Sequence, residues 1–246
     1  MLKSVKILRE RISDPNAYPF SVPAIAGLTE LKFHSRIVFF AGENGSGKST
    51  LLEAIAAHYG FGREGGNRNF NFTTTESNSS VDPLVRALRL SFDVRTGKGF
   101  FLRAESFFNA ATYIDRIDAT ASYGGRSLHT RSHGETFLEV IQEKCHAAGL
   151  FLLDEPEAAL SPQRQLSFLV LIHDVLKKYK DAQFIISSHS PVLLGYPKAQ
   201  ILSFDDAHIH EVAYEDIPAT QIVRRFVSDR ENFLARLLGD TPKLFE

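Results

Sequence analysis

The sequence predicts an α/β domain with a mostly parallel central sheet flanked by helices, and three observations carry this prediction. Short apolar runs alternate with longer amphipathic stretches, as they do in βαβ units. One apolar run, at 36–41, passes directly into a glycine-rich turn that a helical pattern follows. The chain has 246 residues, 43% of them hydrophobic and 23% charged, which is enough to bury a substantial core and excludes a wholly disordered protein.

The first part of the chain predicts five strands and one helix. The strand at 36–41 is largely apolar, so we expect it to be buried on both faces. A helix is expected at 48–58, where apolar residues recur on one side, whereas the Gly, Asn, Ser and Thr residues of 60–80 predict a loop. Glycines between the last two strands favour a hairpin, which would form an antiparallel β part of the fold. The five strands cover residues 3–9, 31–33, 36–41, 88–94 and 100–103.

The second part of the chain predicts helices that alternate with strands. The apolar run at 150–153 and the stretch at 183–187, which is apolar at its centre, are short, as buried strands of a parallel sheet are. Residues 219–238 predict one or two helices. The predicted strands cover 150–153, 183–187, 199–204 and 209–213, and the helices cover 106–118, 134–147, 162–179 and 219–238. We expect a single domain over 1–246, with a smaller helical and loop subdomain inserted at about 60–147.

Bulk properties exclude several classes of protein. With 28 basic and 29 acidic residues the net charge is −1, so a strongly basic nucleic-acid binder is not indicated. Cys145 is the single cysteine, which excludes an intrachain disulfide and a cysteine-rich zinc site. No apolar stretch approaches the ~20 residues that a membrane-spanning helix needs, and residues 1–10 lack the apolar segment of an export signal. The sequence therefore predicts a cytoplasmic chain without a membrane span of its own.

A phosphate-binding loop follows the strand at 36–41. Residues 42–49 read GENGSGKS, which fits G-x-x-x-x-G-K-[ST] at every fixed position. Glycines let the backbone turn successive N–H groups toward phosphate oxygens, and the following helix directs its positive end at the same charge. Lys48 is expected to reach the β- and γ-phosphates, and the Ser49 hydroxyl to bind Mg²⁺. The predicted nucleotide-binding residues are Gly42, Glu43, Asn44, Gly45, Ser46, Gly47, Lys48, Ser49 and Thr50.

Two further groups of polar residues follow later apolar runs. Asp154 and Glu155 come directly after 150–153, where Asp154 is expected to hold Mg²⁺ and Glu155 to act as general base for an attacking water. His189 follows 183–187, from which it is expected to reach a γ-phosphate. The predicted catalytic residues are Glu155, His189 and Lys48.

Together these motifs resemble those of the ABC-type ATPases. GENGSGKST resembles the phosphate loop of that family, LFLLDEPEAALS its Walker B strand and D-loop, SSHS its histidine switch, and SHGE at 132–135 stands where its signature motif stands. More narrowly, the chain is similar to small, stand-alone predicted ATPases of the AAA and ABC type. The resemblance implies a P-loop fold, ATP and Mg²⁺ as ligands, and an ATP-dependent homodimer. In such a dimer each chain contributes signature and D-loop residues to its partner's nucleotide, here Ser132, His133, Gly134, Glu135 and Ser161.

The chain departs from the family pattern at several positions. Transporter ATPases carry LSGGQ as their signature, whereas this chain has His133 at a glycine position and Glu135 in place of Gln, and Ser161 replaces the D-loop Asp. These differences weigh against a standard transporter subunit. Glu105 is the positional candidate for the metal-contacting Gln of the family, and Tyr18 or Phe20 is the candidate for stacking on adenine.

Several functions remain open. The favoured one is an ATPase that couples nucleotide-gated dimerisation to a partner protein or nucleic acid; the alternatives are an ATP-binding subunit of a membrane transporter and a low-turnover nucleotide-binding switch. The presence of both Glu155 and His189 weighs against the switch, because a sensor needs no general base. The interval from Ser49 to Asp154 has no heptads, which excludes ATPases with long coiled-coil arms. A DNA-binding role would use a set of basic residues as its phosphate contacts, but we favour the interpretation that they form a scattered, solvated surface. These residues are Arg63, Arg68, Arg86, Arg89, Arg95, Lys98 and Arg103.

Overall fold

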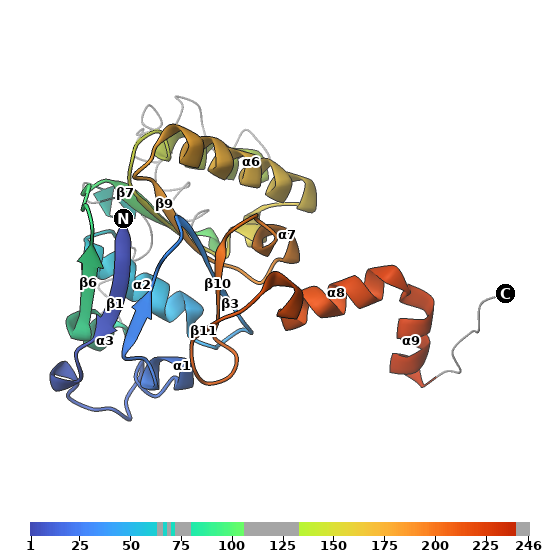
Figure 1. The fold of residues 1–246 in the computed structure, drawn as a ribbon, viewed down its shortest axis with the longest axis horizontal. Coiled ribbons are helices and arrows are strands. Elements are labelled where there is room, and N and C mark those ends of the chain that lie inside the picture. The colour runs from blue at the N-terminus through green and yellow to red at the C-terminus, as the bar shows by residue number, and fades with distance from the viewer. Residues whose placement is uncertain (63–65, 68–69, 72–79, 106–132, 240–246) are drawn as a thin grey trace.

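The computed structural model describes residues 1–62, 66–67, 70–71, 80–105 and 133–239. Its strands form two sheets (Figure 1). The strands are β1 (Leu2–Ile7), β2 (Glu30–Lys32), β3 (Ile37–Ala41), β4 (Gly66–Asn67), β5 (Phe70–Asn71), β6 (Leu88–Phe92), β7 (Gly99–Arg103), β8 (Leu150–Asp154), β9 (Gln183–Ser187), β10 (Gln200–Ser203) and β11 (His210–Glu211). The larger sheet has the order β11-β10-β3-β9-β8-β7-β4-β5, and the smaller has the order β2-β1-β6.

Helices connect most of the strands. The α-helices are α1 (Pro23–Ala26), α2 (Lys48–Tyr59), α3 (Asp82–Ala87), α5 (His133–Lys144), α6 (Pro162–Lys178), α7 (Pro191–Leu194), α8 (Pro218–Ser228) and α9 (Arg230–Leu238). Short 3₁₀ turns are η1 (Arg9–Arg11), η3 (Pro156–Ala159) and η4 (Tyr214–Asp216). The predicted helix at 106–118 lies outside the described residues.

The centre of the larger sheet is parallel, as the sequence predicts. β10, β3, β9, β8 and β7 pair in parallel, and β11 and β4 add antiparallel strands beside them. Every residue of β3, β8 and β9 is buried, which accounts for the apolar runs at their centres. Because these strands are parallel, the loops that leave their carboxyl ends meet at one edge of the sheet.

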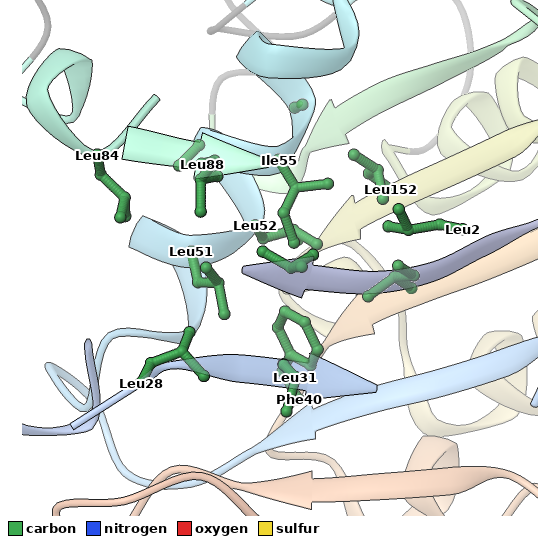
Figure 2. Packing of buried hydrophobic residues seen from close by; sticks show 14 of the residues in the cluster. Leu2, Leu28, Leu31, Phe40, Leu51, Leu52, Ile55, Leu84, Leu88 and Leu152 are labelled. Atoms are coloured by element: carbon green, nitrogen blue, oxygen red, sulfur yellow. The ribbon is translucent and has the colours of Figure 1, made fainter. Parts of the chain in front are cut away.

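Alternate residues of β3 divide the core into two clusters, one on each face of the larger sheet. Phe39 packs in a cluster with Phe168 of α6 and with residues of α5. Phe40 packs in the other cluster, with Leu51 and Ile55 of α2 and with residues of the smaller sheet. Figure 2 shows the side chains of α2, β8 and the smaller sheet that meet in this second cluster. The small antiparallel sheet therefore covers α2 and holds the helix that begins at the phosphate loop.

The predicted hairpin of 88–94 and 100–103 is wrong. β6 pairs antiparallel with β1 in the smaller sheet, whereas β7 pairs in parallel with β8 in the larger sheet. The burial of the two strands explains the difference, because β7 is buried at its three central residues while β6 alternates toward solvent. The glycines between them carry the chain from one sheet to the other, and Gly99 adopts a φ of +124° where the chain enters β7.

The interval 60–147, in which we expect an inserted subdomain, contributes β6 and β7 to the two sheets. Residues 106–132 within it lie outside the described part of the chain. The boundaries of a subdomain there stay a prediction.

Two helices, α8 and α9, cover the predicted helical stretch at 219–238, and they extend away from the body (Figure 1). Asp229 divides them, because its side chain accepts a hydrogen bond from the backbone N–H of Asn232 and so caps α9.

Candidate active site

The phosphate loop connects β3 to α2, and its backbone needs glycine at particular positions. Gly42, Gly45 and Gly47 adopt φ values of +140°, +81° and +103°, which side chains disfavour. A Cβ atom on Gly47 would lie 2.9 Å from Cγ1 of Val22, and one on Gly42 would lie 2.7 Å from Oδ1 of Asp205. Conformation and close packing therefore both select glycine at 42 and 47.

Lys48 is buried at the start of α2, and its ammonium is held inside the loop. Nζ donates hydrogen bonds to the carbonyl oxygens of Gly42 and Glu43, each at 2.7 Å. Burial lowers the pKa of Lys48 below its ordinary value, because a buried ammonium loses hydration. Negative charges on Glu155, Asp205, Asp154 and Glu157 oppose this shift. The ammonium thus lies among carboxylates at the carboxyl edge of the sheet.

Ser49 and Asp154, the two predicted metal ligands, lie in contact. The hydroxyl of Ser49 donates a hydrogen bond to Oδ1 of Asp154 at 2.8 Å, although 105 residues separate them in sequence. The strand order β3-β9-β8 brings the two together across the end of β9. A hydroxyl and a carboxylate are oxygen donors of the kind that Mg²⁺ prefers when it keeps water and phosphate as its other ligands. The donor set therefore fits Mg²⁺.

Arg103, the last residue of β7, is a site residue that the motif analysis did not assign to the site. Its Nε donates to Oδ2 of Asp154 at 3.0 Å, and Nη2 donates to Oε2 of Glu53 at 2.9 Å. Burial acts to lower the pKa of Arg103, but the charges of Asp154 and Glu53 raise it above its ordinary value. Arg103 is also one of the candidate DNA contacts in the sequence, yet these ion pairs direct its guanidinium into the site.

Glu155 is held in an unusual backbone conformation immediately after β8. Its φ of +50° and ψ of +51° are left-handed, which costs a residue with a side chain about 1–3 kcal/mol. Hydrogen bonds at both ends fix this turn: its N–H donates to the carbonyl of Ser187 at 3.0 Å, and its carbonyl accepts from the N–H of Ala158 at 3.0 Å. The backbone turns sharply at the position predicted to carry the general base.

His189 follows β9, and its side chain is 49% exposed, so it is not a core histidine. It lines a pocket together with Gly42 and Asn44 of the phosphate loop and with Asp205. Its backbone N–H donates to Oε1 of Glu157 at 2.8 Å. The histidine predicted from the sequence therefore borders the phosphate loop.

Asp205 is a second residue that motif reading missed. It follows β10, and its Oδ1 accepts a hydrogen bond from the N–H of Glu43 at 2.6 Å, which fixes the start of the phosphate loop. The available signal was the acidic pair after a buried strand, Asp205 and Asp206, since β10 adjoins β3 in the sheet.

The signature and D-loop segments lie against each other within the chain. Gly134 packs so closely on the carbonyl of Ala159 that a Cβ atom would lie 3.0 Å from this oxygen. Glu135 pairs with Arg164 of α6 at 2.8 Å. Ser161 is exposed at the start of α6. Ser132 lies outside the described residues, and His133 begins α5.

The remaining predictions concern adenine and the metal. Phe20 is buried in the core, so it is not available to stack on a ligand. Tyr18 is 45% exposed, and its hydroxyl lies 3.0 Å from Oγ1 of Thr50 at the start of α2. Glu105 is exposed two residues after Arg103, and its contact with a metal stays a prediction.

Comparison with known proteins decides the family. A family model described as "AAA domain" matches residues 21–147, just over half of the chain, and another, described as "AAA domain, putative AbiEii toxin, Type IV TA system", matches residues 136–195. The thiamine import ATP-binding protein of Rhizobium meliloti is 31% identical over 169 residues, which are 63% of this chain and 69% of that protein. The chain belongs to the ABC-type P-loop ATPase family. The resemblance seen in the sequence is thereby confirmed.

Other similarities of this ABC-type ATPase agree with its fold. The xylose import ATP-binding protein of Moorella thermoacetica is 23% identical over 241 residues, which are 89% of this chain and 48% of that protein, so the chain spans about half the length of this relative. The ADP conformation of an ATP-binding cassette of an ABC transporter aligns with a TM-score of 0.50 at 15% identity and covers 93% of this chain and 97% of the cassette. That likeness shows the shared fold. Within the described part of the ATPase, no helix has the length and apolar character required to span a membrane.

Proposed function

We propose that this ABC-type ATPase hydrolyses ATP with Mg²⁺ as cofactor and that ATP joins two copies of the chain. The observation that supports hydrolysis is the convergence of three separate strand ends on one site. Ser49 contacts Asp154 across the end of β9, from which His189 emerges. The charge of Glu155 interacts with the ammonium of Lys48 at the same edge of the larger sheet.

The charge of the site supports the need for a divalent cation. Lys48 and Arg103 carry the positive charge, against the carboxylates Glu53, Asp154, Glu155, Glu157 and Asp205. An ATP triphosphate would add further negative charge to this set. Mg²⁺ bound by Ser49 and Asp154 would neutralise the phosphates and the charge that develops on them.

Each residue of the site would then have a separate role in binding or hydrolysing ATP. The loop N–H groups and Lys48 bind and orient the phosphates, which requires Nζ to exchange the carbonyls of Gly42 and Glu43 for phosphate oxygens. Glu155 accepts a proton from the attacking water, and His189 approaches the γ-phosphate from the side. Asp205 holds the start of the loop through the N–H of Glu43.

Dimerisation is supported by the family resemblance and by the exposure of the relevant segment. Ser161 is exposed, and Gly134 lies packed against the D-loop, so the two segments form one unit that a second copy can contact. In this proposal Ser132, His133 and Gly134 of each copy enclose the γ-phosphate held by the other, so ATP binding favours the dimer and hydrolysis releases it. The dimer acts on a partner protein or nucleic acid in the cytoplasm.

Two curated relatives are named as ATP-binding proteins for import, which supports the alternative of a transporter subunit. The departures of His133 and Glu135 from LSGGQ weigh against it. The DNA alternative has limited support: Arg95 lies over the ring of Tyr59 at 4.9 Å, and Arg103 is ion-paired within the site.

Glu155→Gln tests both parts of the proposal. The amide keeps the size of the side chain, so the variant should bind Mg-ATP, lose hydrolysis and accumulate as an ATP-bound dimer, whereas ADP should give monomer. Phosphate release with Mg²⁺ or with EDTA measures turnover, and size-exclusion chromatography with light scattering measures assembly. A Glu155→Gln protein that stays monomeric with saturating ATP contradicts ATP-joined dimerisation, and undiminished turnover contradicts the role of Glu155.

A further inference from the structure

Glu157 makes contacts that the motif analysis did not anticipate. It lies in η3, two residues after Glu155, and its side chain is 8% exposed. Its Oε1 accepts hydrogen bonds from the hydroxyl of Ser188 and from the backbone N–H of His189, each at 2.8 Å. The same oxygen lies 3.5 Å from Nδ1 of the His189 ring. One carboxylate oxygen thus hydrogen-bonds the backbone of the histidine and lies beside its ring.

The second carboxylate oxygen of Glu157, Oε2, is destabilising to the folded protein. Oε2 is buried and has no hydrogen-bond partner among the residues that the structure describes. A half-satisfied buried carboxylate is less favourable to folding than a fully bonded or apolar group. Since such groups concentrate at functional sites, a role beyond packing is indicated.

We propose that Glu157 is a positioning residue that sets the orientation of the His189 ring. With Nδ1 beside the carboxylate, the nitrogen on the opposite edge of the ring, Nε2, is left for a γ-phosphate in the pocket that His189 lines with Gly42 and Asn44. This inference rests on the proposed ATPase function. Glu157 acts through His189 and touches no reacting atom.

The position of Glu157 also ties two strand ends together. Glu157 follows β8, which carries Asp154 and Glu155, whereas Ser188 and His189 follow β9. The hydroxyl of Ser188 further accepts a hydrogen bond from the N–H of Ser190 at 3.1 Å, so the segment after β9 is fixed on both sides of His189. The Glu157 carboxylate therefore fixes the position of His189 relative to Glu155, the predicted general base.

The test compares Glu157→Gln, Glu157→Ala, His189→Ala and the double variant Glu157→Ala/His189→Ala. Glu211→Gln is the matched control, because Glu211 also lies beside a histidine, with Oε2 at 2.8 Å from Nε2 of His34, but on an exposed edge strand. Phosphate release at saturating Mg²⁺ gives kcat and KM for ATP. The imidazole signals of the nucleotide-free protein, observed by NMR with His189→Ala as the assignment reference, give a readout that does not depend on turnover.

The expected result is that Glu157→Ala lowers kcat by roughly tenfold while KM changes by less than about threefold, since orientation matters most as charge rearranges. Glu157→Gln should lower kcat less, because its amide oxygen still accepts hydrogen bonds. The double variant should be no slower than His189→Ala alone. The His189 imidazole signal should move in both Glu157 variants and stay unchanged in Glu211→Gln.

A wild-type kcat in both Glu157 variants, or losses that add in the double variant, would overturn the positioning role. If Glu157→Ala fails to fold, Glu157→Gln decides through the same two readouts. If the wild-type protein hydrolyses no ATP, the proposed function fails. In that case a moved His189 signal still supports the positioning of the ring, and an unmoved signal overturns it.

Discussion

Nε of Arg103 donates a hydrogen bond to Oδ2 of Asp154 at 3.0 Å, joining the last residue of β7 to the last residue of β8. The other carboxylate oxygen of Asp154 accepts from the hydroxyl of Ser49. Asp154 is therefore held from both sides before any metal is considered. The strand order sets the orientation of Asp154. β7 supplies Arg103, β8 supplies Asp154 itself, and β3 leads through the phosphate loop to Ser49.

Replacing Arg103 should show how much its ion pairs with Asp154 and Glu53 contribute to the stability of the fold. Arg103→Met removes the positive charge between Asp154 and Glu53, and breaking a largely buried ion pair by removing one partner costs about 3 kcal/mol or more. We expect a lower midpoint in urea denaturation with an unchanged slope. Arg89→Met, at an exposed position in β6, is the control and should change the midpoint little. Equal stability of the two variants would show that the pair contributes nothing.

Lys48→Ala should fold but bind ATP at least about tenfold more weakly, because a hydrogen bond to a charged group contributes roughly 1.5–3 kcal/mol. Only Lys48 of the phosphate loop carries an ammonium that already lies within hydrogen-bonding distance of loop carbonyls. A fluorescent ATP analogue measures the affinity, and circular dichroism checks the fold. Unchanged affinity in the folded variant would remove the assignment of the loop.

Gly99→Ala should destabilise the protein strongly. A Cβ atom at this position would lie 1.9 Å from the carbonyl oxygen of Leu150, and φ is +124°. Overpacking and strain together should cost at least about 3 kcal/mol. Gly239→Ala is the matched control, since φ is +81° there and, apart from its chain neighbours, no atom of the described residues would lie within 4 Å of the added Cβ, so it should cost only about 1–2 kcal/mol of backbone strain. Thermal unfolding measures the loss of stability in both variants. Equal losses would show that the close approach of β7 to β8 is unimportant.

Cys145 gives a prediction for pH. Burial raises the pKa of its thiol well above the ordinary value of 9.0, so above that pH the unfolded chain loses a proton that the folded chain keeps. The folded state then binds more protons than the unfolded state, and stability falls as pH rises, by up to about 1.4 kcal/mol per pH unit for one proton. The free energy of unfolding of Cys145→Ala, measured from pH 8 to pH 10, should fall less steeply than that of the wild type. Parallel curves would contradict the effect.

The parallel core and the position of the phosphate loop between β3 and α2 could be predicted because they depend on local patterns. Short apolar runs identified β3, β8 and β9, and fixed glycine positions identified the loop. Strand pairing depends on contacts distant in sequence, and this is why β6 and β7 were wrongly joined in a hairpin. Arg103 and Asp205 were missed as site residues for the same reason, since only the order of strands places them beside Asp154 and Glu43.

The order of strands also has a consequence for synthesis on the ribosome. β3, which leads into the phosphate loop, lies between β9 and β10, and both neighbours are made more than a hundred residues later. Until they emerge, five apolar residues of β3 have no sheet neighbours to cover their edges, and pairing between such distant segments is slow. A nascent chain therefore gains the ability to bind nucleotide only after β9 and β10 have emerged, following a long interval in which its central strand is accessible to chaperones or to aggregation.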